Sequence, residues 1–259
     1  MTEYSLDNTW EQASPRLALL ENQLDPISHR RLRATGLSGG WRCLEVGGGG
    51  GSITRWLCEQ VGADGYVLAT DVEPALLEQV HCSQLEIRRH DILNDPPPSA
   101  EFDVVHARWL LHHLSDPVEA MRRMTSAVRP GGWIVLEEPD FSPFRLSSSQ
   151  TYTAFMSELA RVAVAGSGGD CFWARNMLQQ VGSLGLKDVG AEADQFLVRG
   201  GAGWAEFFSL TSQQVRAKMT APEGMLTDKA FDAGIALLAE PGLIELGVAG
   251  IAVWGQKAV

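Results

Sequence analysis

The alternation of apolar runs with amphipathic stretches in the first half of the chain predicts a doubly wound α/β fold. Five apolar runs have the length of buried strands: 41–46, 65–70, 85–89, 102–106 and 133–137. Between them, apolar residues recur at helical spacing over 51–61, 74–80 and 109–128, and we expect the last helix to continue past Asp116-Pro117. Strands that alternate with helices form right-handed βαβ units and a parallel sheet.

The segments on either side of this repeat predict a helical cover. Apolar spacing from Trp10 to Leu24 predicts one helix, and Asp25-Pro26 predicts the start of a second, with Asp25 as its N-cap. Later segments predict a helix at 175–184, a strand at 187–198, a helical insertion at 203–239 and a last buried strand at 250–255. We expect one domain with three parts: a helical cover over 1–36, a ligand-binding core over 37–139, and substrate-side insertions with closing strands over 140–259.

Five consecutive glycines at 47–51 follow the first predicted strand directly, and a predicted helix begins behind them. Glycine has no Cβ, so it adopts positive φ easily and lets a ligand lie on the backbone. A strand, a glycine turn and a helix N-terminus form a nucleotide-type site. The run satisfies neither Gly-x-Gly-x-x-Gly/Ala nor the P-loop pattern, but it fits Gly-x-Gly-x-Gly at Gly47, Gly49 and Gly51.

Three acidic residues lie at the predicted carboxyl ends of the first three strands, where such sheets bind ligands. Glu45, two residues before the glycines, would repel the pyrophosphate of a dinucleotide and instead suits a cationic ligand such as S-adenosylmethionine. Asp71 could accept hydrogen bonds from ribose hydroxyls, as in NAD sites. Asp91 could face an adenine amino group, with the Ile92 N–H on a ring nitrogen, or could be a turn residue. A nicotinamide-dependent oxidoreductase is the less favoured alternative.

Five segments together resemble the motif set of class I S-adenosylmethionine-dependent methyltransferases: LEVGGGGGS, ATDVEP, RRHDIL, FDVVHARWLLHHLSDP and RPGGWIVLEEPD. They look most like the ubiquinone/menaquinone-type branch, common in actinobacterial secondary metabolism. The resemblance covers about 41–139, and more loosely the first 36 residues and the last strand. It implies a Rossmann-like sheet of seven strands, the last antiparallel, with the cofactor across the first four. Glycine replaces the family's usual cysteine, alanine or threonine within the glycine run, which we expect to loosen the loop.

The resemblance also implies roles for individual residues toward S-adenosylmethionine. It places Glu45 and the glycine backbone on the methionine part, Asp71 on the ribose, and Asp91 with Ile92 on the adenine edge. Val72 would pack on the adenine, and Tyr4 would fold over the cofactor. The backbone carbonyl of His106, just past the fourth predicted strand, would face the methionine amine. The sequence suggests no metal site.

Methyl transfer from a sulfonium requires alignment of the acceptor, and a general base only where the acceptor keeps its proton. His106, His112, His113, Arg108, Glu137 and Glu138 are the candidates near the cleft. Among them we select His113, Glu138 and Arg108 as catalytic candidates. One of the paired histidines is expected to pack locally, and alternation along a strand lets only one of the paired glutamates face the cleft. Arg108 either binds an acidic substrate group or pairs with a neighbouring carboxylate.

Composition narrows the choice of partners. The chain has 21 basic and 32 acidic residues, for a formal net charge of −11, which argues against a nucleic-acid partner. No apolar run of membrane-spanning length, no signal peptide and no Cys-x-x-Cys pair is present, so we expect a cytoplasmic protein with reduced thiols.

We therefore expect a monomer or homodimer that methylates O, N or C of a small, partly apolar acceptor in natural-product or quinone-like metabolism. Aromatic residues between 141 and 208 would line the acceptor site. The alternative is a fold that binds S-adenosylmethionine and catalyses another step, such as a cyclisation.

Overall fold

The strands form one seven-stranded sheet in the order β3-β2-β1-β4-β5-β7-β6. The computed structural model describes residues 6, 10–99 and 101–259. The strands are β1 (Arg42–Val46), β2 (Tyr66–Asp71), β3 (Leu85–Arg89), β4 (Phe102–Arg108), β5 (Val128–Asp140), β6 (Lys187–Arg199) and β7 (Ile244–Gln256). Strand β7 runs antiparallel to β5 and β6, whereas the β3-to-β5 pairs are parallel. The doubly wound sheet with an antiparallel last strand is confirmed.

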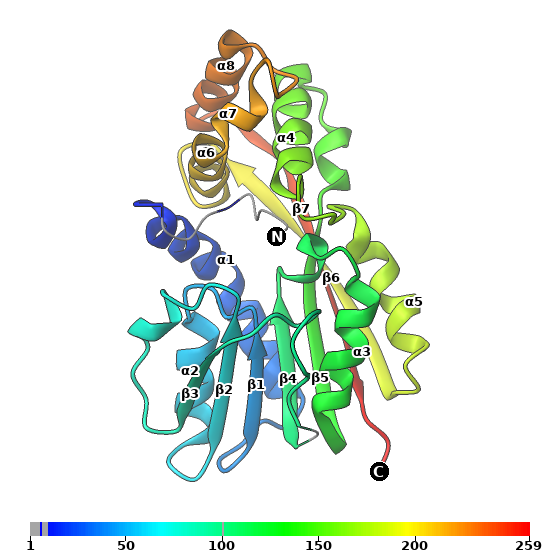
Figure 1. Cartoon of the computed structure of the whole chain (residues 1–259). Helices are drawn as coiled ribbons and strands as arrows, with labels where there is room; N and C mark the ends of the chain where they lie inside the picture. Colours follow the sequence, from blue (N-terminus) through cyan, green and yellow to red (C-terminus); the bar gives the residue numbers. More distant parts are fainter. Residues whose placement is uncertain (1–5, 7–9, 100) are drawn as a thin grey trace.

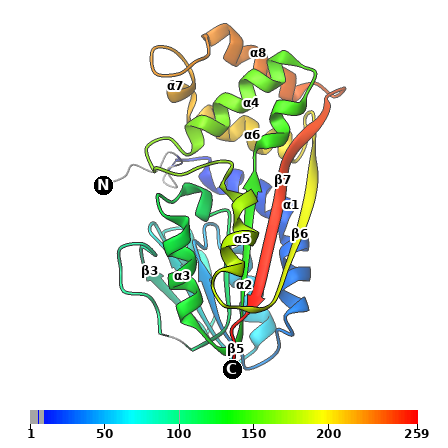
Figure 2. The ribbon, with the colours of Figure 1, turned by 90° about the vertical axis from the view of Figure 1, so that its right-hand side faces the viewer.

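Helices cover both faces of this sheet (Figures 1 and 2). Both faces are covered because the strands carry apolar side chains on both sides. On one face, Cys43, Val67 and Val104 pack against α1 (Ala13–Ala34) and α2 (Ser52–Val61). On the other face, Leu44 and Val105 pack against α3 (Pro117–Ala127) and α5 (Met177–Gly182). Glu45 and His106, in register with each other, therefore point toward α1 and α2.

The expectation of two N-terminal helices is wrong. A single helix, α1, runs through Pro26, and Asp25 lies inside it without capping anything. The Asp25 carboxylate instead accepts hydrogen bonds from Arg108 and Ser52, both at 2.9 Å. A proline inside a helix costs about 3 kcal/mol. Contacts of this kind with β4 and α2 offset that cost, and local sequence spacing does not reveal them.

The expectation of a continuous helix at 109–128 is also wrong. Strand β4 extends to Arg108, a short 3-10 turn η2 (Leu111–His113) follows, and α3 begins only at Pro117. Asp116 starts α3, because its side chain accepts the Glu119 N–H at 2.9 Å. The Asp-Pro pair is thus a helix start, as expected of an N-cap followed by proline at the first helical position.

Two further boundaries differ from the sequence expectations. The predicted helix at 74–80 is reduced to a 3-10 turn, η1 (Leu77–Gln79). Strand β5 is longer than the predicted strand at 133–137 at both ends, and Gly131 near its start has a φ of 76°.

The second half of the chain builds a helical lobe above the carboxyl ends of the central strands (Figure 1). Its helices are η3 (Ser142–Leu146), α4 (Gln150–Ala163), α6 (Trp204–Gln214), α7 (Arg216–Met219) and α8 (Asp228–Ala239). The 3-10 turn η4 (Trp173–Asn176) lies outside the lobe, with Trp173 in the core between the sheet and α3. The lobe has its own core, which includes Phe144, Tyr152, Phe155, Phe208 and Phe231. The helical insertion expected at 203–239 is confirmed, and long β5, β6 and β7 extend into the lobe (Figure 2). Among the described residues, no helix has the length and apolar character to cross a membrane.

Candidate active site

A cavity of about 910 Å³ lies between the carboxyl ends of β1, β2 and β4 and the helical lobe. The glycine turn, Asp71, Asp91 and Arg108 line its sheet side, and Trp109, Phe141, Phe207 and Phe208 line its lobe side. Ligand cavities are typically about 300–1,000 Å³, so this one has room for a large ligand or two smaller ones.

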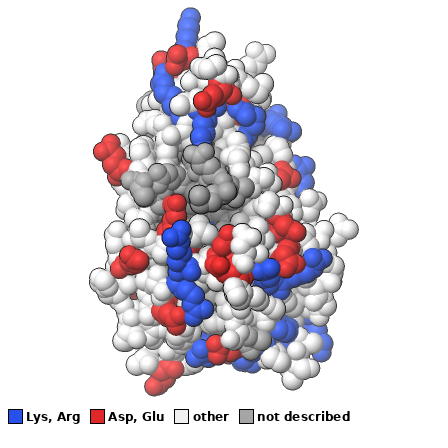
Figure 3. All heavy atoms as spheres, in the orientation of Figure 1, with Lys and Arg blue, Asp and Glu red and all other residues white. Residues whose placement is uncertain are grey.

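Acidic and basic side chains are interspersed on the face of the molecule in Figure 3, without a continuous basic patch.

The glycine turn has two kinds of glycine. Gly47, Gly49 and Gly51 have φ values of 73°, 53° and 84°, as the Gly-x-Gly-x-Gly spacing predicts. Gly48 and Gly50 leave room for neighbouring side chains, because a Cβ at Gly48 would lie 2.7 Å from Leu77 Cδ2 and a Cβ at Gly50 would overlap the Glu21 carboxylate, so a side chain at either position would displace its neighbour. Neighbouring side chains therefore fill the space that the two extra glycines leave, which the expectation of a loosened loop did not foresee.

Asp71 is the last residue of β2 and lines the cavity beside the glycine turn. Its Oδ2 accepts the Gly49 N–H at 3.1 Å and its Oδ1 accepts the Glu73 N–H at 2.9 Å. Burial raises the pKa of Asp71, against the lowering effect of these hydrogen bonds. Each carboxylate oxygen keeps a second lone pair for a ligand. Val72 also lines the cavity, with 45% of its surface exposed.

Asp91 and Ile92 line the cavity next to β3. Asp91 Oδ1 accepts the Leu93 and Asn94 N–H groups at 2.8 and 3.2 Å, and Oδ2 accepts from Asn94 Nδ2 at 2.8 Å. Burial opposes ionisation of Asp91, but these hydrogen bonds outweigh it and lower its pKa. The turn role that the sequence left open is therefore present, at a position that also faces the cavity.

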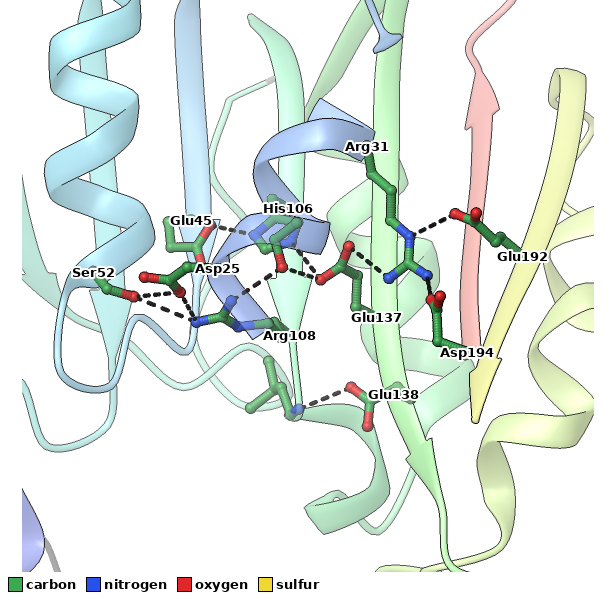
Figure 4. Close-up of polar contacts among 12 residues, drawn as sticks. Asp25, Arg31, Glu45, Ser52, His106, Arg108, Glu137, Glu138, Glu192 and Asp194 are labelled. Atoms are coloured by element: carbon green, nitrogen blue, oxygen red, sulfur yellow. Dashed lines mark hydrogen bonds and ion pairs between the residues drawn. The ribbon is translucent and has the colours of Figure 1, made fainter. Parts of the chain in front are cut away.

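His106 joins two carboxylates beneath the cavity (Figure 4). Its Nδ1 lies 2.6 Å from Glu45 Oε2, and its Nε2 lies 3.8 Å from Glu137 Oε2. Burial alone would lower the pKa of His106, but the charges of Glu45 and Glu137 raise it to about 9. His106 lies inside β4, so its expected place just past the strand is wrong, and its side chain is fully enclosed. The strand register of Glu45 and His106 is the signal that could have revealed this contact.

The ion-pair network continues from Glu137 to α1 and β6 (Figure 4). Glu137 accepts a hydrogen bond from Ser28 Oγ and lies 3.2 Å from Arg31 Nη1. The other nitrogens of the same guanidinium pair with Glu192 and Asp194. Burial opposes ionisation of Glu137, but the contact with the charged His106 ring and the charge of Arg31 lower its pKa to about 2.

Arg108 reaches the same network from the cavity wall. It donates to Ser28 at 3.0 Å and to Asp25 at 2.9 Å. Of the two roles that the sequence left open for Arg108, pairing with a carboxylate is present.

Glu138 holds the turn that follows β4. Its carboxylate accepts the N–H groups of Leu110, Leu111 and His112 at 2.8, 2.7 and 3.2 Å, and it lies 2.7 Å from His112 Nδ1. Trp109, at the start of this turn, has a φ of 56°, a conformation that bulky side chains rarely adopt. Neither Glu138 nor Glu137 is among the described residues that line the cavity.

His112 and His113 both line the cavity. Burial, with the neighbouring His112 and Arg16, lowers the pKa of His113 well below its usual value. Of the aromatic residues predicted for the acceptor site, Phe141, Phe207 and Phe208 line the cavity. Trp109 was not singled out by the sequence. Tyr4 lies outside the described residues.

Comparisons with a family model and with curated proteins both point to methyltransferases. A family model described as a methyltransferase domain matches residues 10–186, well over half of the chain. The methyltransferase str3 of Strobilurus tenacellus is 30% identical over 144 residues, which cover 54% of this chain and 50% of that protein. The ubiquinone/menaquinone biosynthesis C-methyltransferase UbiE of Vibrio vulnificus is 27% identical over 136 residues, covering 48% of this chain and 51% of that one. The chain thus spans about half the length of these curated relatives.

Solved structures share the fold at low sequence identity. Phosphoethanolamine N-methyltransferase 2 of Haemonchus contortus, in complex with S-adenosylhomocysteine, has a TM-score of 0.55 and 16% identity, covering 97% of this chain and 54% of that one. The [4+2]-cyclase SpnF has a TM-score of 0.55 and 17% identity, covering 91% of this chain and 81% of that one. These likenesses concern the fold alone.

Proposed function

Because this chain belongs to the methyltransferase domain family, we propose that it transfers a methyl group from S-adenosylmethionine to a small molecule bound on the lobe side of the cavity. The observation that carries the proposal is the Asp71 carboxylate, which the Gly49 N–H orients at 3.1 Å beside three left-handed glycines. Its free lone pairs suit two ribose hydroxyls, and the glycine backbone allows a ligand to approach closely.

The walls next to Asp71 fit the rest of this cofactor. Val72 and Ile92 provide apolar contacts for an adenine, and the Asp91 carboxylate is nearby. The carboxylates of Glu21 and Glu45 line the same cavity near the glycine turn. Because His106 balances much of the Glu45 charge, it is mainly Glu21 that would repel a pyrophosphate and attract a cationic amino-acid group. This charge distribution favours S-adenosylmethionine over a nicotinamide dinucleotide.

The lobe side of the cavity suits a flat, partly apolar acceptor. Trp109 stacks on Trp204, with ring centroids 5.6 Å apart, and Phe207 meets it edge to face at 5.9 Å. Phe141 lies 6.2 Å from Trp109 on another side. Enclosure by aromatic side chains excludes water and orients a bound ring, which are the protein's main contributions to methyl transfer.

His112 is the proton acceptor that the geometry supports best for an acceptor with a hydroxyl or N–H group. Bound S-adenosylmethionine supplies a methyl group on a sulfonium leaving group. Because Nδ1 of His112 is committed to Glu138, Nε2 is the ring atom left to accept a proton. A carboxylate behind an imidazole fixes its tautomer and stabilises its charged form. His113, with its low pKa, is a weaker base, and Glu138 acts through His112.

Calorimetry with S-adenosylmethionine and S-adenosylhomocysteine tests the cofactor assignment. We expect binding by the wild type and a loss of at least tenfold in affinity for Asp71→Ala, because two ribose hydrogen bonds are lost. Asp64→Ala, the same change at an exposed site, should bind as the wild type does. Absence of binding by the wild type, or equal binding by Asp71→Ala, would refute the proposal.

Radiolabelled methyl donor with candidate acceptors then tests the reaction itself. Label in the acceptor supports methyl transfer. Conversion of an acceptor to an isomer, with the label still on the donor, would support a cyclisation instead.

A further inference from the structure

A carboxylate of the site should balance the positive charge of bound S-adenosylmethionine. Which carboxylate does so is an inference that rests on the proposed function. S-adenosylmethionine carries an α-ammonium and a sulfonium. Glu45, the residue that the sequence suggests, already lies 2.6 Å from the His106 ring. With its pKa raised to about 9, His106 is protonated at neutral pH and neutralises much of the Glu45 charge.

The other carboxylates of this region have partners too. Asp25 is paired with Arg108 at 2.9 Å, and Asp71 is held by the N–H groups of Gly49 and Glu73 in an orientation that suits a ribose. Neither is placed to compensate a further cation without giving up a contact that the fold uses.

Glu21, on α1, differs from these three carboxylates. It lines the cavity, and its carboxylate accepts the N–H of Ser52 at the start of α2. Among the described residues, no basic side chain forms an ion pair with it. Burial, followed by the charge of Asp25, raises the pKa of Glu21. The charges of Arg108 and Arg55 oppose this rise only in part, so a cationic ligand would further stabilise the ionised form.

The glycine turn is shaped around this side chain. A Cβ at Gly50 would overlap Oε1 of Glu21, whereas Gly50 itself does not have a left-handed φ that would require glycine. The absence of a side chain at this position thus admits a carboxylate from α1 into the turn where the cofactor is expected.

We propose that Glu21 binds the α-ammonium group of S-adenosylmethionine, so that α1 contributes directly to the cofactor site. An ammonium has three N–H donors, and the Glu21 oxygens have lone pairs beyond the one that Ser52 uses. A charge-assisted hydrogen bond of this kind is stronger than a neutral one, and partial burial strengthens it further.

Calorimetry of Glu21→Gln with three ligands tests this assignment. S-adenosylhomocysteine keeps the ammonium but lacks the sulfonium, and 5′-methylthioadenosine lacks the whole amino-acid part. We expect Glu21→Gln to weaken S-adenosylmethionine and S-adenosylhomocysteine by the same factor, about tenfold to a hundredfold, and to leave 5′-methylthioadenosine unchanged. Glu59→Gln, on the exposed side of α2, is the matched control and should bind all three as the wild type does.

Each other outcome is decisive. Unchanged affinities, or an equal loss for 5′-methylthioadenosine, would overturn the role of Glu21 in binding the ammonium. A loss for S-adenosylmethionine alone would assign Glu21 to the sulfonium and overturn the proposal. A wild type that binds none of the three ligands would instead overturn the proposed function.

A double-mutant cycle tests the role of Gly50. Gly50→Ala should weaken S-adenosylmethionine about tenfold in the wild type, because the new Cβ displaces the Glu21 carboxylate. In a Glu21→Ala background, the same change should have little further effect. Additive losses would show that Gly50 and Glu21 act separately and would overturn this part of the inference.

Discussion

The buried His106 should make the stability of the protein decrease at alkaline pH. Its pKa is raised from 6.5 to about 9 in the folded state, chiefly by Glu45 and Glu137, against the effect of burial. A raised pKa stabilises the fold fully below the unfolded value of 6.5, and this contribution is lost as the pH rises through about 9. At about 1.4 kcal/mol for each tenfold change in proton affinity, the contribution is about 3 kcal/mol.

The assay is urea denaturation followed by tryptophan fluorescence at pH values from 6 to 9.5. We expect the wild type to lose about 3 kcal/mol of unfolding free energy across this range, in addition to what His106→Gln loses. Glutamine can donate to Glu45 but carries no charge, so the difference between the two proteins should shrink as the pH rises. His81→Gln, at an exposed histidine, controls for titration unrelated to the network.

A difference between wild type and His106→Gln that stays constant from pH 6 to 9.5 would refute the reasoning. Glu45→Gln provides a second check, because it removes one of the two charges that raise the pKa of His106. In that variant the loss of stability should begin at a lower pH. The low pKa of Glu137 arises partly from the same contact with His106, so the two contributions are not additive.

Two further predictions concern the turn that bears Trp109. Glu138→Ala should lower the unfolding free energy by about 4 kcal/mol, because three N–H groups, two of them buried, and His112 Nδ1 lose their acceptor. A loss below about 1 kcal/mol in urea denaturation would contradict this. His112→Gln should lower kcat for a hydroxyl acceptor about a hundredfold or more while the Kd for S-adenosylmethionine stays the same. Equal kcat losses for His112→Gln and His113→Gln would contradict the choice of His112.

The parts of the site that the sequence predicts well are those fixed by local geometry. The left-handed conformations of Gly47, Gly49 and Gly51 follow from their spacing and from the strand–turn–helix context. The place of Asp71 at the end of β2 follows from the length of the apolar run before it. In these cases the backbone conformation and the residue type constrain each other directly, so the pattern alone is informative.

The parts that the sequence misses depend on contacts between distant segments. The helix through Pro26 is held by contacts of Asp25 with Arg108 and Ser52, which local spacing does not reveal. Glu21 lies far from the glycine run in the sequence, so nothing in the glycine motif points to it. The left-handed conformation of Trp109 could not be predicted from the sequence either, because the Glu138 contacts that hold its turn come from another strand.

Strand β5 connects the cofactor side and the acceptor side through two consecutive residues. Alternation along the strand directs Glu137 to α1 and Glu138 to the turn after β4. Glu137 holds α1 through Ser28 and Arg31, and α1 carries Glu21. Glu138 holds the turn that carries His112. The residue proposed to bind the ammonium and the residue proposed to accept a proton are therefore positioned by adjacent carboxylates on one strand.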